Sequence, residues 1–224
     1  MSTETVVARM NPPHSGLYAR ELEDACIEFG IESELAKSHF LGQVAHESLN
    51  FTRPRESLNY SVEALASKFG RHRISLSDAA RYGRSSYHPA NQPAIANALY
   101  GGEWGRLNLG NVLPDDGWKF RGGGLIHTTG RGNFLRTSLA LFGDRTLIEH
   151  PELIVEPRIA ARAAAYYWRW KGLNEWAEKD DLLAVSRGVN LGDPEHHGTP
   201  NGMADRRLKT ALAKSLFREL RKYA

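Results

Sequence analysis

The chain of 224 residues contains a single cysteine, Cys26, so no disulfide bond can form within it. A protein that folds without disulfides is typical of a reducing compartment. The sequence also lacks an apolar run long enough to span a bilayer, and its first residues lack the apolar core of a secretory signal peptide. We therefore expect synthesis in the cytoplasm, with some separate release route if the target lies outside it.

The chain also lacks a large excess of either positive or negative charge. The chain carries 29 lysines and arginines against 26 aspartates and glutamates, a formal net charge of +3. That excess is too small to predict nucleic-acid binding, and no nucleic-acid recognition motif is present. It would favour an anionic polymer or surface as a partner. With 41% hydrophobic residues and no linker or repeat, the chain is expected to form one globular domain over residues 1–224.

Helical periodicity dominates the chain, and convincing alternating strands are few. Ser15 as N-cap and Gly30 as the residue after the C-terminus predict a helix between them. Further helices are expected near residues 34–49, 61–70, 77–82, 91–100, 132–142, 157–171, 180–187 and 202–224. Residues 101–124 are glycine-rich and are expected to be irregular, while residues 124–129 are the best candidate for a short extended segment. The sequence thus predicts a mainly α fold.

The helix expected at the C-terminus has a candidate buried face and many basic residues. Its apolar face would consist of Ala204, Leu208, Ala211, Leu212, Leu216 and Leu220. The sequence leaves open two interpretations of its basic residues. Either they form a solvated helix face, or they make a weak contact with an anionic outer membrane.

One glutamate continues an apolar stripe at the end of a predicted helix. Phe40, Val44 and Glu47 follow at i, i+4 and i+7, so they share one helix face. Glu47 also lies near the C-terminus of that helix, where the helix dipole disfavours negative charge. Both effects favour a protonated carboxyl group, which is what a general acid requires.

A second glutamate, nine residues later, has the opposite setting. Glu56 is flanked by Arg53 and Arg55, and nearby cations favour the ionised form that a general base requires. Two carboxyl groups in opposed settings are the pattern of glycoside hydrolysis. The alternative is that both are ordinary solvated charges. His46 precedes Glu47, but the segment HESLN does not match the H-E-x-x-H zinc pattern, and we expect no metal.

Five ordered blocks favour the catalytic interpretation. They are FLGQVAHESLNF (40–51), RESLNYS (55–61), DGWKFRGGGLIHTTGRGNF (116–134), AAYYWRWKGLN (164–174) and VNLGDP with NGMADRR (189–207). In this order they resemble family 19 glycoside hydrolases, above all the bacteriophage endolysin branch and next the bacterial chitinases. The resemblance implies a lysozyme-like helical fold with a cleft between a larger and a smaller lobe. It places the smaller lobe within about residues 72–117, with no separate wall-binding domain and no cofactor.

The resemblance also assigns roles to residues. It implies that Glu47 is the acid, Glu56 is the base and Thr129 helps to hold the attacking water. Hydrolysis would invert the anomeric configuration, so the two carboxyl groups are expected roughly 6.5–9.5 Å apart. The expected substrate-binding residues are His127, Asn133, Asn190, Arg206, Trp118 and Tyr60. The chain departs from the family, which usually carries Arg at Gly123, Gln at His127 and Leu at Thr128, so subsite specificity stays open.

We expect a phage endolysin that cleaves β-1,4 bonds in the glycan of bacterial peptidoglycan and causes host cell lysis. It would be made in the host cytoplasm and act as a monomer in the periplasm or cell wall after release by a holin. The motifs do not separate this activity from that of a chitinase acting on poly-N-acetylglucosamine. A non-catalytic glycan-binding homologue is the third alternative, although retention of both glutamates and Thr129 argues against it.

Overall fold

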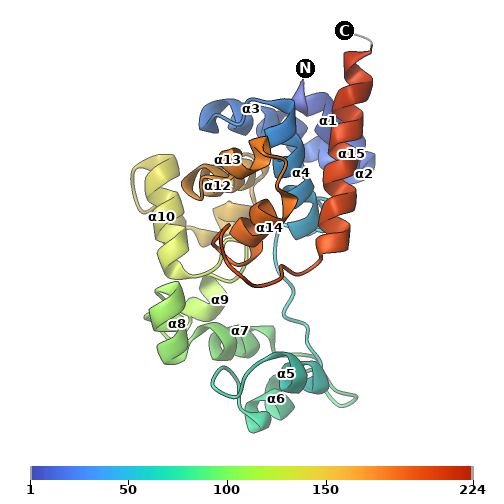
Figure 1. Ribbon diagram of the computed structural model, residues 1–224. Helices are drawn as coiled ribbons and strands as arrows, with labels where there is room; N and C mark the ends of the chain where they lie inside the picture. Colours follow the sequence, from blue (N-terminus) through green and yellow to red (C-terminus); the bar gives the residue numbers. More distant parts are fainter. Residues whose placement is uncertain (1, 223–224) are drawn as a thin grey trace. The chain divides into compact units, whose positions relative to one another are not determined.

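The computed structural model describes residues 2–222 and is mainly α, which confirms the predicted fold class (Figure 1). Within this range β pairing is limited to isolated bridges, such as the one between Arg55 and Gly123. No helix among these residues combines the length and the apolar character needed to cross a lipid bilayer.

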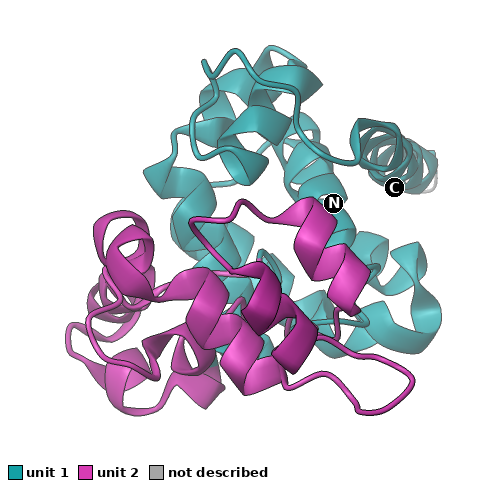
Figure 2. Ribbon diagram, turned by 90° about the horizontal axis from the view of Figure 1, so that it is seen from below, with its two compact units in different colours: residues 1–54, 124–126, 154–224 teal, residues 55–123, 127–153 magenta. Residues whose placement is uncertain are grey.

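The chain divides into two compact units (Figure 2). Unit 1 contains residues 1–54, 124–126 and 154–224, and unit 2 contains residues 55–123 and 127–153. The smaller lobe expected within residues 72–117 falls inside unit 2, which extends beyond it on both sides. The two candidate catalytic carboxyl groups belong to different units, because Glu47 lies in unit 1 and Glu56 lies in unit 2.

Unit 1 is built from helices at both ends of the chain. They are α1 (Thr3–Met10), α2 (Pro12–Ser15), the 3-10 turn η1 (Gly16–Tyr18), α3 (Ala19–Phe29), α4 (Glu34–Glu47), α12 (Pro157–Trp170), α13 (Leu173–Glu178), α14 (Leu182–Asn190) and α15 (Met203–Arg221). A further 3-10 turn, η2 (Pro151–Val155), crosses the boundary between the units.

Local capping explains several of these helix ends. Gly30 has a φ of 69° and ends α3 in the left-handed conformation that glycine adopts without strain, as predicted. Ser33 caps α4, since its hydroxyl accepts the Ala36 N–H at 3.0 Å. The predicted cap at Ser15 is wrong. Ser15 ends α2, and its hydroxyl instead accepts the Asn11 N–H at 3.2 Å.

Helix α4 is buried nearly all round and packs closely against α15. A Cβ atom added at Gly42 would lie 2.8 Å from the Thr210 Cα, so the two backbones approach more closely than a side chain would allow. The predicted buried face of α15 is largely wrong. Leu208 and Leu212 are 70% and 41% exposed. The buried face contains Arg206, Thr210, Ala213, Leu216 and Phe217. Hydrophobicity alone misplaced the face because two of these residues are polar.

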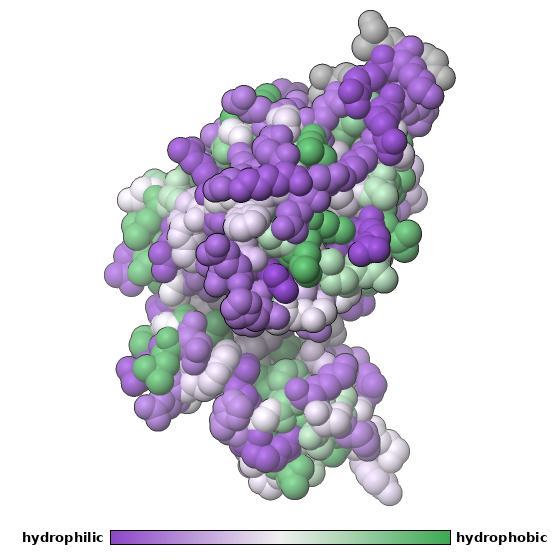
Figure 3. All heavy atoms as spheres, viewed as in Figure 1, coloured by the Kyte–Doolittle hydropathy of each residue, from purple (hydrophilic) through white to green (hydrophobic). Residues whose placement is uncertain are grey.

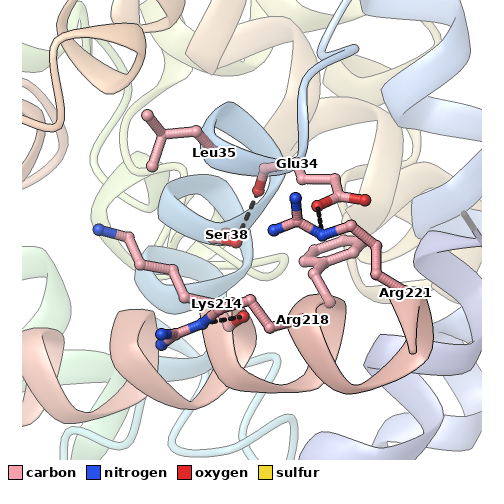
Figure 4. A pocket seen from close by; sticks show the side chains of 7 residues that line it. Glu34, Leu35, Ser38, Lys214, Arg218 and Arg221 are labelled. Atoms are coloured by element: carbon pink, nitrogen blue, oxygen red, sulfur yellow. Dashed lines mark hydrogen bonds and ion pairs between the residues drawn. The ribbon is translucent and has the colours of Figure 1, made fainter.

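Hydrophilic residues cover the C-terminal end of α15 (Figure 3). The six basic residues of the helix differ in exposure: Arg207, Arg218 and Arg221 are exposed, Lys209 and Lys214 are half-buried, and Arg206 is buried. Acidic neighbours neutralise three of them. Lys209 pairs with Asp205 at 3.1 Å, Lys214 pairs with Asp180, and Arg221 pairs with Glu34 at 3.1 Å, the last shown in Figure 4. The positive charge available to an anionic surface is therefore smaller than the sequence indicates, and a membrane contact stays a prediction.

Unit 2 contains α5 (Val62–Lys68), α6 (Leu76–Tyr82), α7 (Gln92–Tyr100), α8 (Gly102–Leu109), α9 (Asp116–Lys119), α10 (Arg131–Phe142) and α11 (Thr146–Glu149). Its apolar core includes Leu58, Leu65, Ile95 and Leu99. The Ser61 hydroxyl caps α5 by accepting the Ala64 N–H at 3.2 Å, within the range 61–70 expected for a helix.

Two predictions fail in the glycine-rich segment. Residues 101–124 are not irregular throughout, because they contain α8 and α9. The buried Asp116 carboxylate organises this region: it accepts the N–H groups of Val112 and Leu113 and binds Arg131 through two donors at 2.6 and 2.7 Å. Residues 124–127 form a turn, and of the expected extended segment only Thr128 pairs, in an isolated bridge with Gly123. Contacts distant in sequence thus decide the local structure.

Candidate functional site

Glu47 is the last residue of α4, and its side chain is 18% exposed. The Arg206 guanidinium, 1% exposed, donates from Nη2 to Glu47 Oε1 at 2.5 Å. Helical phase places Glu47 on the face of Phe40 and Val44, which are fully buried, while Glu47 itself keeps some contact with solvent. It does not reveal the cation, which lies 159 residues further along the chain.

Arg206 is fixed by further acceptors around it. Its Nη1 donates to Gln43 Oε1 at 2.5 Å, and its Nε donates to the Asn201 carbonyl at 2.9 Å. Asn190 shapes the same loop, because its side-chain oxygen accepts the Asn201 N–H at 2.9 Å. The structure therefore brings together three predicted site residues, Glu47, Arg206 and Asn190, and engages Arg206 with the predicted acid.

The residues next to Glu47 and Arg206 in the chain also form a pair. His46, which precedes Glu47, has its Nδ1 2.6 Å from Oδ2 of Asp205, which precedes Arg206. Burial by itself would raise the pKa of Asp205, but hydrogen bonds from His46 and Lys209 outweigh burial and lower it. The pKa of Tyr167 is raised, first by burial and then by the charge of Glu47. The sequence marked Tyr167 only as part of the AAYYWRWKGLN block.

Glu56 is held by two donors of unit 2. Its Oε1 accepts the Gly122 N–H at 2.5 Å, and its Oε2 accepts the Tyr100 hydroxyl at 2.8 Å. The backbone repeats the first contact, since the Glu56 N–H donates to the Gly122 carbonyl at 3.0 Å. Burial, and then the charge of Glu56, raise the pKa of Tyr100, so its hydroxyl stays protonated as a donor. Tyr100 ends α7 and carries no motif that the sequence could have revealed.

Close packing also explains a glycine next to Glu56. A Cβ atom added at Gly122 would lie 3.2 Å from Glu56 Cδ and 3.3 Å from His127 Cβ. His127 has a φ of 51°, a left-handed conformation that is uncommon for residues other than glycine. Such strained positions concentrate at functional sites. The predicted substrate residue His127 therefore lies in the tightly packed loop beside the predicted base.

Thr129 is oriented by its own loop. Its hydroxyl donates to the His127 carbonyl at 2.8 Å, and Asn133 Nδ2 donates to the Thr129 carbonyl at 2.8 Å. Because the hydroxyl hydrogen is engaged, the lone pairs of the Thr129 oxygen remain able to accept a hydrogen bond from water. The amide nitrogen of Asn133 holds the loop, which leaves its side-chain oxygen for a ligand.

The two aromatic candidates of unit 2 have different surroundings. The Arg121 guanidinium lies 3.5 Å from the centre of the Trp118 ring and covers one of its faces. Tyr60 packs edge-on against Phe69, with 5.3 Å between ring centres. The pKa of Tyr60 is raised, first by burial and then by the charge of Glu56. Tyr60 thus lies within electrostatic reach of the predicted base. Across the described range, 2–222, no histidine, cysteine and acidic side chains cluster in a group of three that could hold a metal.

Comparison with known proteins finds similarity by sequence and by structure, although no family model matches the chain. The chain is 32% identical over 163 residues to a "Glycosyl hydrolase family 19 domain-containing protein" of Haemophilus influenzae, covering 73% of this chain and 74% of that protein. The crystal structure of a chitinase C mutant matches with a TM-score of 0.59 and 16% identity, over 96% of this chain and 91% of that chain. At that identity the structural match supports the fold alone.

Proposed function

Because the chain belongs to glycosyl hydrolase family 19, we propose that it is a phage endolysin that cleaves β-1,4 bonds in the glycan of bacterial peptidoglycan. Family membership makes the chain a glycoside hydrolase, and hydrolysis of a glycan follows from it. The choice of peptidoglycan is supported by the sequence blocks that resemble the endolysin branch. The enzyme would be made in the host cytoplasm, be released by a holin and lyse the host from the periplasm.

The observation that carries the catalytic assignment is the way in which each carboxyl group is held. Glu47 is bound by the buried Arg206, and Glu56 is bound by a backbone N–H and by the Tyr100 hydroxyl. The donors to Oε1 of each carboxyl group lie 159 and 66 residues away in the chain, so tertiary contacts hold both groups in place. Acid–base catalysis requires side chains that are oriented before the substrate arrives.

In the proposed mechanism Glu47, which is paired with Arg206 in the resting enzyme, first takes up a proton from solvent. It then donates this proton to the glycosidic oxygen, so the leaving sugar departs as an alcohol. Glu56 accepts a proton from a water molecule that attacks the anomeric carbon on the opposite ring face, which inverts its configuration. Thr129 accepts a hydrogen bond from the same water. After proton transfer Glu47 is a carboxylate, and the Arg206 guanidinium stabilises its new charge.

Replacement of the acid tests the mechanism. Glu47→Gln keeps an oxygen that can accept from Arg206, but its amide protons are not acidic enough for general acid catalysis. Hydrolysis should therefore be lost while the helical circular dichroism is retained. Glu32→Gln, at an exposed position just before α4, is the matched control and should remain active. Near-wild-type hydrolysis by folded Glu47→Gln would show that Glu47 is not the acid.

Product analysis tests the substrate. Mass spectrometry of products from purified peptidoglycan should show glycan fragments. A reducing-end N-acetylmuramic acid identifies a muramidase, and a reducing-end N-acetylglucosamine identifies a glucosaminidase. Absence of soluble products from peptidoglycan, together with cleavage of chitin oligomers, would replace the endolysin proposal by the chitinase alternative, because both polymers contain β-1,4-linked N-acetyl sugars.

A further inference from the structure

A basic pocket of about 290 Å³ lies in unit 2. Its lining consists of Arg55, Asp115, Trp118, Lys119, Arg121, Pro151 and Glu152, and we call it the Arg55–Arg121 pocket. Three cations and two carboxylates face it, so its formal charge is positive. All of its residues belong to unit 2, as does Glu56.

The pocket adjoins the segments that hold the predicted base. Arg55 directly precedes Glu56, and Arg121 directly precedes Gly122, whose N–H binds the Glu56 carboxylate at 2.5 Å. An isolated bridge between Arg55 and Gly123 joins the two segments. A group bound in the pocket would therefore lie beside the part of a substrate that reaches Glu56.

The guanidinium of Arg121 is held in an orientation that suits the binding of a planar anion. Its guanidinium stacks on Trp118 at 3.5 Å from the ring centre, and its Nη1 donates to the Trp118 carbonyl at 2.8 Å. Stacking fixes the plane of the guanidinium but leaves its in-plane donors available, and this fork matches the two oxygens of a carboxylate. Within the described chain, Nε and Nη2 of Arg121 have no protein acceptor.

Arg55 supplies a second cation with a donor atom that is unpaired within residues 2–222. Its Nη1 is buried and has no hydrogen-bond acceptor among the described residues. Burial, and then the charge of Arg121, lower the pKa of Arg55 to about 10, although Glu56 and Glu152 act in the opposite direction. Two neighbouring, partly buried guanidinium groups are stabilised when an anion binds between them.

We propose that the Arg55–Arg121 pocket binds a carboxylate of the peptide stem of peptidoglycan while the glycan lies at Glu56, an inference that rests on the proposed function. The stem begins at the lactyl group of N-acetylmuramic acid and carries free carboxylates. Three extended residues span at most about 11 Å, enough to reach an adjoining pocket. Chitin has no such substituent, so the pocket would favour peptidoglycan over chitin.

The test compares two forms of one polymer. Purified peptidoglycan is used intact or after an amidase has removed its peptide stems, and chitin oligomers serve as a third substrate. Arg121→Gln should lower kcat/KM on intact peptidoglycan by about ten- to hundredfold, mainly through KM, because a bond to a charged group is lost. On stripped glycan it should stay within about twofold of wild type. Arg121→Lys, which keeps the charge but not the fork, should be intermediate.

Controls separate binding from folding. Arg81→Gln removes an exposed arginine of unit 2 that also lies over an aromatic ring, 5.6 Å from the centre of the Tyr82 ring, and should change neither activity. If Arg121→Gln lowers the melting temperature, Lys119→Glu is tested in its place. It reverses the charge of another residue that lines the pocket and should show the same selective loss. An equal loss on intact and stripped glycan, or no loss on either, overturns the pocket proposal. Wild-type enzyme that degrades neither form of peptidoglycan but cleaves chitin oligomers overturns the proposed function itself.

Discussion

Replacement of Arg206 by methionine should destabilise the protein because it removes the cation that holds Glu47. Methionine occupies a similar volume but donates no hydrogen bond. The change leaves Glu47, 18% exposed, without its ion pair. It also leaves the buried oxygen of Gln43 and the Asn201 carbonyl without their donors. Unmet acceptors of this kind are costly when water cannot replace the lost partner.

The expected loss can be estimated from this geometry. Breaking a buried ion pair typically costs about 3–5 kcal/mol. Because the Glu47 side chain keeps some contact with water, we expect the lower end, about 3 kcal/mol. For a chain of this size 1 kcal/mol corresponds to about 2–4 °C, so the melting temperature should fall by about 6–12 °C.

Urea unfolding followed by circular dichroism measures the difference, with Arg207→Met as the control. Arg207 is the exposed neighbour on the same helix, so the two variants share any change in helix propensity. The control should stay within about 0.5 kcal/mol of wild type. Equal stability of the two variants would refute the argument that the Arg206 network stabilises unit 1. A double-mutant cycle with Glu47→Gln then isolates the coupling between the two side chains.

Three further predictions concern contacts that the sequence did not reveal. Tyr100→Phe removes a donor to Glu56, so kcat should fall about tenfold and the acidic limb of the pH–activity profile should move to higher pH; an unchanged profile would contradict a role in orienting the base. Gly122→Ala places a Cβ atom 3.2 Å from Glu56 Cδ and should lower kcat with little change in helical circular dichroism, whereas full activity would show that the carboxylate tolerates displacement. Burial lowers the pKa of His39 below its ordinary 6.5 despite its hydrogen bond to Asp180. As pH falls below about 6.5, His39 is therefore protonated in the unfolded chain before it is protonated in the folded chain. The free energy of unfolding declines as a result. His39→Gln should flatten the loss of stability between about pH 7 and pH 5, and an unchanged slope would assign it to other groups.

Much of the architecture could be predicted from local signals. Serine caps and terminal glycines locate helices such as α5 and the end of α3, because these ends depend on hydrogen bonds within a few residues. The same locality explains the failures. Asp116 organises α9 through donors that include Arg131, and no pattern in the glycine-rich segment revealed this arrangement.

The sequence by itself determined the helical class, the family and the two glutamates worth testing, since periodicity and ordered motifs are properties of the chain. Only the tertiary structure decided which groups surround those glutamates. Arg206 reaches Glu47 across 159 residues, and Tyr100 reaches Glu56 across 44. The tertiary structure also decided that a partly polar face of α15 is buried, because the Arg206 cation is stable where several acceptors surround it. Those acceptors come from distant segments of the chain, and no pattern in the linear sequence reveals that they meet.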